Sequence, residues 1–225
     1  MFKKLYLSFS LVVLSVAIAG RMAHPALQPA PVQEEPAAEP EMELTVISEY
    51  DHIIRNVSLA ENHDWRFISA IAYHESRFRP DAVSSRGARG LMQIMPVVAR
   101  QFEVEETEIM DPQTNVRLAA MLLNDIDRTL RIPSQVEEQQ RMKIILAAYN
   151  AGVGHVSDAR RLAVKHGEDC NDWSVVARYL ELKSQPEYYR DEVVRSGRFT
   201  GIEQTSAFVE QVVGRYAKYC LLASR

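Results

Sequence analysis

Apolar residues recur at intervals of three and four from residue 45 onward, which is the spacing of one face of an α-helix. The first such stripe comprises Val46, Ile47, Tyr50, Ile53, Ile54 and Val57. No run alternates convincingly between apolar and polar residues, and no Asn-Gly or Asp-Gly turn separates two apolar segments. The pattern therefore predicts an all-α domain, or a predominantly helical α+β domain at most, with one short irregular ribbon in the loop 84–95.

Polar and proline residues mark where the predicted helices begin. In chain order these residues are Asp64, Pro96, Asp111, Ser134 with Glu137 as a capping box, Asp172, Ser184 and Thr205. The helix after Asp111 is expected to be long, with Val116, Ala119, Ala120, Leu122 and Leu123 on its inner side. Gly152 is expected to take a left-handed position at the end of the helix that precedes it.

The first 44 residues have a different character from the rest. Lys3 and Lys4 precede an apolar run that ends at Ala19, which is typical of an export signal over residues 1–19. An uncleaved signal would instead associate the protein with the membrane. Residues 20–44 are rich in proline, alanine and glutamate and predict a flexible linker. The domain itself is expected to span residues 45–225, in a protein that is exported to the periplasm or cell envelope.

The charge distribution limits the classes of partner. The net charge of −4 favours no polyanion-binding role, so nucleic acid is not an expected partner. Six arginines nevertheless cluster in the sequence around residues 66–100: Arg66, Arg77, Arg79, Arg86, Arg89 and Arg100. Two interpretations stay open for them, a solvated loop face and a local positive field that attracts an anionic polymer.

Glu75 is the best candidate for chemistry. Ile68, Ile71 and Ala72 form an apolar stripe, and Glu75 falls on the same face at the end of that helix. Burial of an ionised carboxylate is unfavourable, so a carboxyl placed there tends to keep its proton near neutral pH, as a general acid must. The alternative is that Glu75 pairs with Arg77 or Arg79 at a solvated edge.

Two separated motifs carry a resemblance to a known family. The run from Glu75 to Pro96, ESRFRPDAVSSRGARGLMQIMP, and the block AAYNAGVGHV from Ala147 to Val156 resemble the lytic transglycosylases with a soluble-transglycosylase (SLT) type catalytic domain, in the lysozyme-like superfamily. The resemblance covers most of residues 62–220. It implies a lysozyme-like globular catalytic domain with a substrate groove for peptidoglycan glycan strands.

The resemblance also implies roles for particular residues. Glu75 matches the catalytic acid and base, and Tyr149 the tyrosine that hydrogen-bonds or orients it. The positions that match the family's saccharide groove are Ser84, Gln93, Met95 and Asn150, with Gly90, Met92 and Ala151 shaping its walls. For the two methionines, core packing is the favoured alternative. One departure is Phe208, which stands where many members carry a tyrosine.

The implied reaction cleaves the bond between N-acetylmuramic acid and N-acetylglucosamine without water and leaves a 1,6-anhydromuramoyl end. A lysozyme-like hydrolase is the first alternative, and it requires a second carboxylate. Asp81 is the nearest in sequence but is expected to bond local backbone. A non-catalytic peptidoglycan-binding protein is the second alternative. No metal or other cofactor is expected, and a disulfide between Cys170 and Cys220 is left open.

Overall fold

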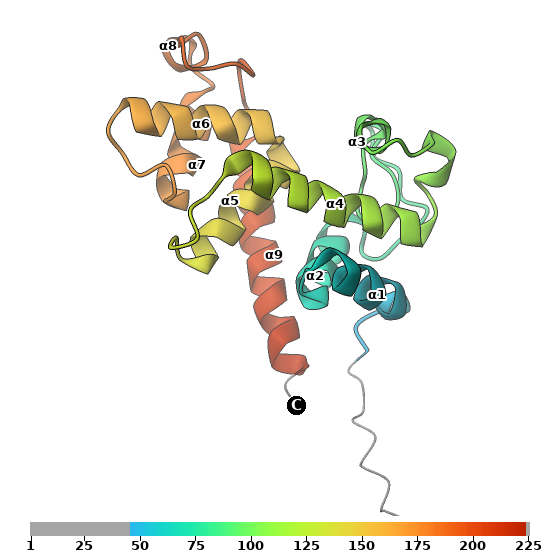
Figure 1. The fold of residues 1–225 in the computed structure, drawn as a ribbon. Coiled ribbons are helices and arrows are strands. Elements are labelled where there is room, and N and C mark those ends of the chain that lie inside the picture. Colours follow the sequence, from blue (N-terminus) through green and yellow to red (C-terminus); the bar gives the residue numbers. More distant parts are fainter. Residues whose placement is uncertain (1–45, 224–225) are drawn as a thin grey trace, which may run out of the picture. The chain divides into compact units, whose positions relative to one another are not determined.

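The computed structural model describes residues 46–223 of the chain (Figure 1). The export signal expected at residues 1–19 and the linker expected at residues 20–44 lie outside these residues. The helices are α1 (Asp51–Glu61), α2 (Trp65–Ser76), α3 (Pro96–Gln101), the 3-10 helix η1 (Glu106–Glu108), α4 (Pro112–Leu130), α5 (Glu138–Ala151), α6 (Val153–Lys165), α7 (Trp173–Leu182), α8 (Pro186–Tyr189) and α9 (Ile202–Leu222).

The described residues form helices and connecting segments, and the all-α prediction is confirmed for them. The expected ribbon is also present, as two isolated antiparallel bridges that join Val83 to Arg89 and Arg89 to Ile94. Within residues 46–223, no helix is both long and apolar enough to cross a bilayer. Cys170 and Cys220 are both thiols, so the pairing left open by the sequence does not occur in this structure.

Four of the expected helix starts are confirmed. The carboxylates of Asp64, Asp111 and Asp172 accept hydrogen bonds from backbone N–H groups in the first turns of α2, α4 and α7. Pro96 is the first residue of α3. Each of these signals is local, because the capping side chain and the amide it satisfies are at most three residues apart.

The other three expected starts are wrong. Helix α5 begins at Glu138 and receives no side-chain cap, so Ser134 and Glu137 form no capping box. Helix α8 follows Gln185 rather than Ser184. Helix α9 begins at Ile202, and the hydroxyl of Thr205 instead donates to the side-chain oxygen of Asn150. Gly152 ends α5 with φ 95° and ψ 135°, a positive φ but not the left-handed helical conformation expected.

A core of aliphatic side chains holds the helices together. Its members include Ile54 of α1, Ile68 and Ile71 of α2, Leu118 of α4, Ile144 of α5 and Val212 of α9, all buried. Helix α9 packs against both α2 and α5, and α1 packs against α4. Figure 1 shows α9 running beside α2 and α5. This packing fixes α2, the helix that carries Glu75.

Candidate active site

Helix α2 presents Glu75 in its last turn. Ile68, Ile71 and Ala72 are fully buried on one face, as the apolar stripe predicted, and Glu75 extends the same face. The helix ends at Ser76, because Arg77 adopts a left-handed conformation at φ 55° and the chain turns away. Glu75 therefore stands at the junction between a rigid helix and the loop 77–95.

The carboxyl of Glu75 is held in an environment poor in solvent. Burial raises its pKa from 4.5 to about 8, although the side chain retains some exposure. No charged side chain among residues 46–223 contributes to this shift. The surface ion pair considered as an alternative is absent there, since Arg77 donates to the hydroxyl of Tyr73 and Arg79 to the carbonyl of Ser76.

Tyr149 lies within the electrostatic reach of Glu75, but its hydroxyl donates a hydrogen bond to another group. Its hydroxyl donates to the carbonyl oxygen of Met92 at 2.8 Å. Burial, followed by the nearby charge of Glu75, raises the pKa of Tyr149 well above its usual range. The hydroxyl is therefore protonated and leaves only its oxygen lone pairs for other partners.

The loop 77–95 is tightly bonded to itself. The side-chain amide of Gln93 donates to the carbonyls of Ala82 and Gly90, at 3.2 and 3.0 Å. Gln93 itself has a positive φ of 50°. The hydroxyl of Ser84 accepts from the amide of Ala88 at 2.9 Å, which closes a turn. Both residues thus shape the loop that follows Glu75.

The remaining expected site residues divide between surface and core. Met92 is fully buried, whereas Met95 is 37% exposed at the start of α3. The side-chain oxygen of Asn150 accepts from the buried hydroxyl of Thr205, which joins the end of α5 to α9. Phe208 is buried in the core. Met95 alone of the two methionines is thus available to a ligand.

Among residues 46–223, no second carboxylate is found to act on Glu75. Asp81 is exposed, and its side chain makes no hydrogen bond to the described residues, so the expected bond to local backbone is wrong. Its charge instead acts on Tyr50, where burial, Glu49 and Asp81 raise the pKa. In the acidic run after α3, Glu106 pairs with Arg89 and Arg100.

Ion pairs with carboxylates partly neutralise the arginines that cluster in the sequence around residues 66–100. Arg66 pairs with Asp64 at 2.6 Å, and Arg100 with Glu106 at 2.6 Å. Arg89 lies 3.7 Å from Glu106. Half of the six arginines are therefore engaged by carboxylates, which weakens the local positive field considered from the sequence.

Sequence reasoning missed Asn115, a fully buried residue of α4. Its side-chain oxygen accepts from the amide of Met92, and its side-chain nitrogen donates to the carbonyls of Arg89 and Ile109. A signal was available, because Asn115 shares the helical face of Leu118 and Ala119 and so places an amide within an apolar stripe.

A buried ionic group farther along the chain was also missed. Asp158 and Lys183 are both fully buried and form an ion pair of 2.7 Å. The ammonium of Lys183 also lies 3.1 Å from Nδ1 of His155. Asp158 further accepts hydrogen bonds from Arg161 and from the amides of Arg195 and Ser196. This group fastens the segment 190–201 to α6.

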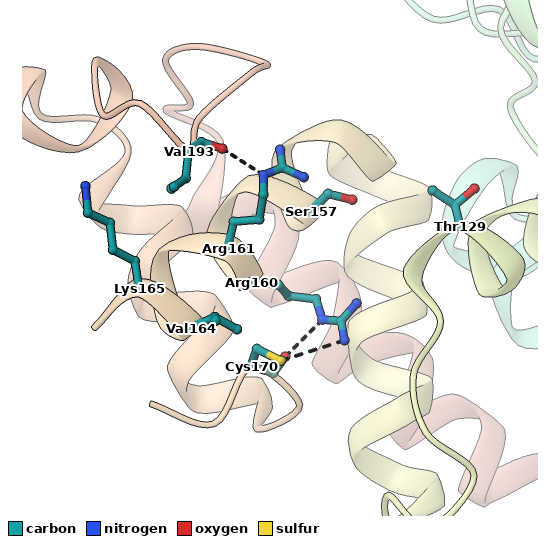
Figure 2. Close-up of a pocket in the computed structure, with 8 residues that line it drawn as sticks. All are labelled: Thr129, Ser157, Arg160, Arg161, Val164, Lys165, Cys170 and Val193. Carbon is teal, nitrogen blue, oxygen red and sulfur yellow. Dashed lines mark hydrogen bonds between the residues drawn. The ribbon is translucent and has the colours of Figure 1, made fainter. Parts of the chain in front are cut away.

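Two surface pockets lie away from Glu75. One of about 430 Å³ is lined by Thr129, Ser157, Arg160, Arg161, Val164, Lys165, Cys170 and Val193, most of them on α6 (Figure 2). The basic side chains of this pocket already donate hydrogen bonds within the protein. Arg160 donates to the carbonyl of Cys170, Arg161 to the carbonyl of Val193, and Lys165 to the carboxylate of Asp191. A pocket of about 390 Å³ near Asp64 and Tyr216 lies at the opposite end of α2 from Glu75.

Comparison with protein families decides the identity of the domain. A family model described as the transglycosylase SLT domain matches residues 52–170. The chain belongs to this family. Its SLT match includes Glu75, the loop 77–95 and Tyr149, and it ends before α7.

Several relatives have similar sequences over part of their length. The chain is 38% identical to membrane-bound lytic murein transglycosylase F 1 of Alkalilimnicola ehrlichii, over 62% of this chain and 28% of that protein. It is 34% identical to membrane-bound lytic murein transglycosylase F of Vibrio campbellii, over 71% of this chain and 30% of that protein. The chain therefore spans less than a third of the length of these curated relatives.

Solved structures support the fold. An inactive mutant of the lytic transglycosylase Slt of Pseudomonas aeruginosa matches with a TM-score of 0.53 and 23% identity, over 76% of this chain and 24% of that chain. The 70 kDa soluble lytic transglycosylase of Escherichia coli matches with a TM-score of 0.51 and 22% identity, again over 76% and 24%. These likenesses confirm the expected all-α fold of an SLT domain.

Proposed function

We propose that this SLT domain is a peptidoglycan lytic transglycosylase that uses Glu75 as its single acid and base. The observation that carries the proposal is the largely desolvated carboxyl of Glu75, whose pKa is raised to about 8 with no charged neighbour among residues 46–223 contributing. Such a group is protonated at neutral pH and can donate to a glycosidic oxygen. The names of the relatives, lytic murein transglycosylases, support the same substrate class.

The reaction balances without water. The proton of Glu75 passes to the oxygen that links N-acetylmuramic acid to N-acetylglucosamine, and the bond from that oxygen to the anomeric carbon breaks. The 6-hydroxyl of the muramoyl residue then bonds to the anomeric carbon and returns its proton to Glu75. Because the attacking group belongs to the substrate, its proximity replaces the water and the second carboxylate that a hydrolase uses.

Residues near Glu75 are proposed to bind the glycan strand and to orient the Glu75 carboxyl. Gln93, Ser84 and Met95 come from the loop after Glu75, and Asn150 from the end of α5 beside Tyr149. Before substrate binds, the oxygen of Tyr149 is proposed to accept a hydrogen bond from the protonated carboxyl of Glu75, which keeps its proton. The envelope-associated location of the protein is part of the same proposal, since its relatives are named as membrane-bound.

Digestion of purified sacculi tests this proposal. We expect the protein to release glycans with 1,6-anhydromuramoyl ends, identified by mass spectrometry, and we expect Glu75→Gln to lower their yield by about 1000-fold or more. A matched control is Glu108→Gln, which removes an exposed carboxyl at η1 and should leave the yield unchanged. Reducing sugar ends would instead identify a hydrolase, and binding without any cleavage would identify a non-catalytic binding protein.

A further inference from the structure

Asn115 occupies an unusual place for an amide side chain. It lies in the first turns of α4 and is fully buried. A buried amide is destabilising unless each of its polar groups has a partner. Figure 1 shows the N-terminal part of α4 beside the segment that joins α2 to α3, where those partners lie.

The side-chain amide of Asn115 clamps that segment through two hydrogen bonds, and a third joins it to Ile109, just before α4. Its oxygen accepts from the amide of Met92 at 2.7 Å, and its nitrogen donates to the carbonyls of Arg89 and Ile109 at 2.9 and 2.8 Å. Gly90 makes this approach possible. At its φ of +77°, an added Cβ would lie 2.5 Å from the side-chain nitrogen of Asn115.

Met92 is consequently held on both sides. Asn115 accepts from its N–H, and its C=O accepts from the hydroxyl of Tyr149 at 2.8 Å. A tyrosine has one O–H proton, so a proton given to Met92 is withheld from Glu75. The oxygen of Tyr149 then presents lone pairs, which accept a hydrogen bond from a carboxylic acid and repel a carboxylate.

We propose that Asn115 is a positioning residue of the active site: by fixing the Met92 peptide, it commits the Tyr149 proton to the loop and so keeps Glu75 in its acid form. This inference rests on the proposed role of Glu75 as a general acid. Asn115 acts through Met92 and Tyr149 and does not itself contact the substrate. Loss of the clamp frees Tyr149 to donate to Glu75 and to stabilise its carboxylate.

The test measures the titration of Glu75 directly. Full-length protein with ¹³C at the glutamate carboxyls is titrated by NMR, and the Glu75 signal is assigned by its absence in Glu75→Gln. Asn115→Asp replaces both donors by a carboxylate oxygen that the carbonyls of Arg89 and Ile109 repel, so the side chain can no longer hold its position against Met92. Gly90→Ala disturbs the same clamp from the other side, because the added methyl group meets Asn115. Asn124→Asp is the matched control on α4, where the asparagine bonds Glu61 instead.

We expect Asn115→Asp and Gly90→Ala to lower the pKa of Glu75 by about one unit or more, and Asn124→Asp to leave it unchanged. The direction is informative, since a new carboxylate at position 115 acting only by its charge would raise that pKa. In a Tyr149→Phe background, Asn115→Asp should cause no further lowering, because the group through which it acts is gone.

The proposal would be overturned if the pKa of Glu75 were unchanged in folded Asn115→Asp and Gly90→Ala, or if the lowering persisted in the Tyr149→Phe background. Loss of near-UV circular dichroism in both Asn115→Asp and Gly90→Ala would also overturn it, because Asn115 would then serve stability alone. Failure of the proposed function is distinguishable from these. A wild-type protein that releases no anhydromuramoyl ends, yet shows the expected NMR shifts, would refute the activity and leave the positioning role standing.

Discussion

Glu75 owes its chemistry to where α2 ends. The helix buries its apolar face and then stops one residue after Glu75, so the carboxyl is desolvated without being enclosed by the core. Burial alone raises its pKa to about 8, and the neighbouring arginines are bonded to Tyr73 and Ser76. The ionisation of this one carboxyl is therefore expected to affect both activity and stability.

The activity of the protein is expected to depend on pH through Glu75. A general acid must carry its proton, so we expect kcat/KM for sacculi to fall as pH rises through about 8, where Glu75 ionises. Release of anhydromuramoyl ends at a series of pH values measures this limb. An activity that rises through the same range would show that Glu75 reacts as its carboxylate.

The stability of the folded protein is also expected to depend on the ionisation of Glu75. The pKa of Glu75 in the folded protein, about 8, lies above the ordinary value of 4.5, so the folded state binds the proton more tightly than the unfolded state does. Stability is therefore lost as pH rises from 4.5 toward 8. Glutamine cannot ionise, so Glu75→Gln should raise the free energy of unfolding at pH 7, relative to its effect at pH 5, by about 2 kcal/mol.

Urea unfolding of the wild type and of Glu75→Gln at the two pH values measures this difference. Glu108→Gln, at an exposed position, is again the control. An equal effect of Glu75→Gln at both pH values would mean that the carboxyl ionises as easily in the folded chain as in the unfolded one.

At the scale of elements, the helix starts that are fixed by neighbouring residues could be predicted and those fixed by distant ones could not. Asp64, Asp111 and Asp172 each bond an amide two or three residues away. Thr205 carries the same kind of side chain, but its hydroxyl bonds Asn150, 55 residues away. No local pattern distinguishes these two uses of a polar side chain.

In the candidate site, too, the features set by neighbouring residues could be predicted and those set by distant residues could not. The burial of Glu75 followed from the spacing of Ile68, Ile71 and Ala72 on its own helix. The hydrogen-bond partner of Tyr149 could not be predicted from the sequence, because Met92 lies 57 residues away. The packing of the loop on α4 brings the two residues together. Two partners of Asn115 are likewise distant, since Met92 and Arg89 lie 23 and 26 residues away, and its place in the apolar stripe of α4 was the local signal that pointed to it.

The capping of α2 gives a prediction at this scale. Asp64 accepts from the amide and side chain of Arg66 and from the hydroxyl of Tyr216. Burial would raise the pKa of Asp64, but the bonds from Arg66 outweigh it and the pKa is lowered. We expect Asp64→Ala to reduce the free energy of unfolding by about 2 kcal/mol, measured by urea titration.

Asp172→Ala is the matched control for this variant. Asp172 caps α7 through Ser174 at a partly exposed position and bonds no other helix among the described residues, so about 1 kcal/mol is expected there. Equal losses in the two variants would show that the bond from Tyr216 of α9 adds nothing to the cap of α2.

At the scale of the whole described chain, one buried carboxylate joins several segments. Asp158 of α6 bonds Lys183 at the end of α7 and the amides of Arg195 and Ser196. The carbonyl of Lys183 in turn accepts from the amide of Phe199, whose ring lies 4.9 Å from that of His155. These contacts hold the segment 190–201 on α6.

Removal of that carboxylate should therefore be costly. Asp158→Asn leaves the buried ammonium of Lys183 without a counter-charge, and we expect a loss of about 3 kcal/mol in the free energy of unfolding. Asp191→Asn, which breaks a surface pair with Lys165, should lose about 1 kcal/mol or less. A loss at Asp158 no larger than that at Asp191 would mean that Lys183 is reached by water or gives up its proton.

The packing of α9 has a consequence for anyone who isolates this domain. The family match ends at residue 170, yet Tyr216 of α9 bonds the cap of α2, and the guanidinium of Arg215 lies 3.8 Å from the ring centre of Tyr73. A fragment limited to residues 52–170 would lack the helix that packs against α2, which carries Glu75. Minimal versions intended for crystallisation or engineering should accordingly extend through Leu222.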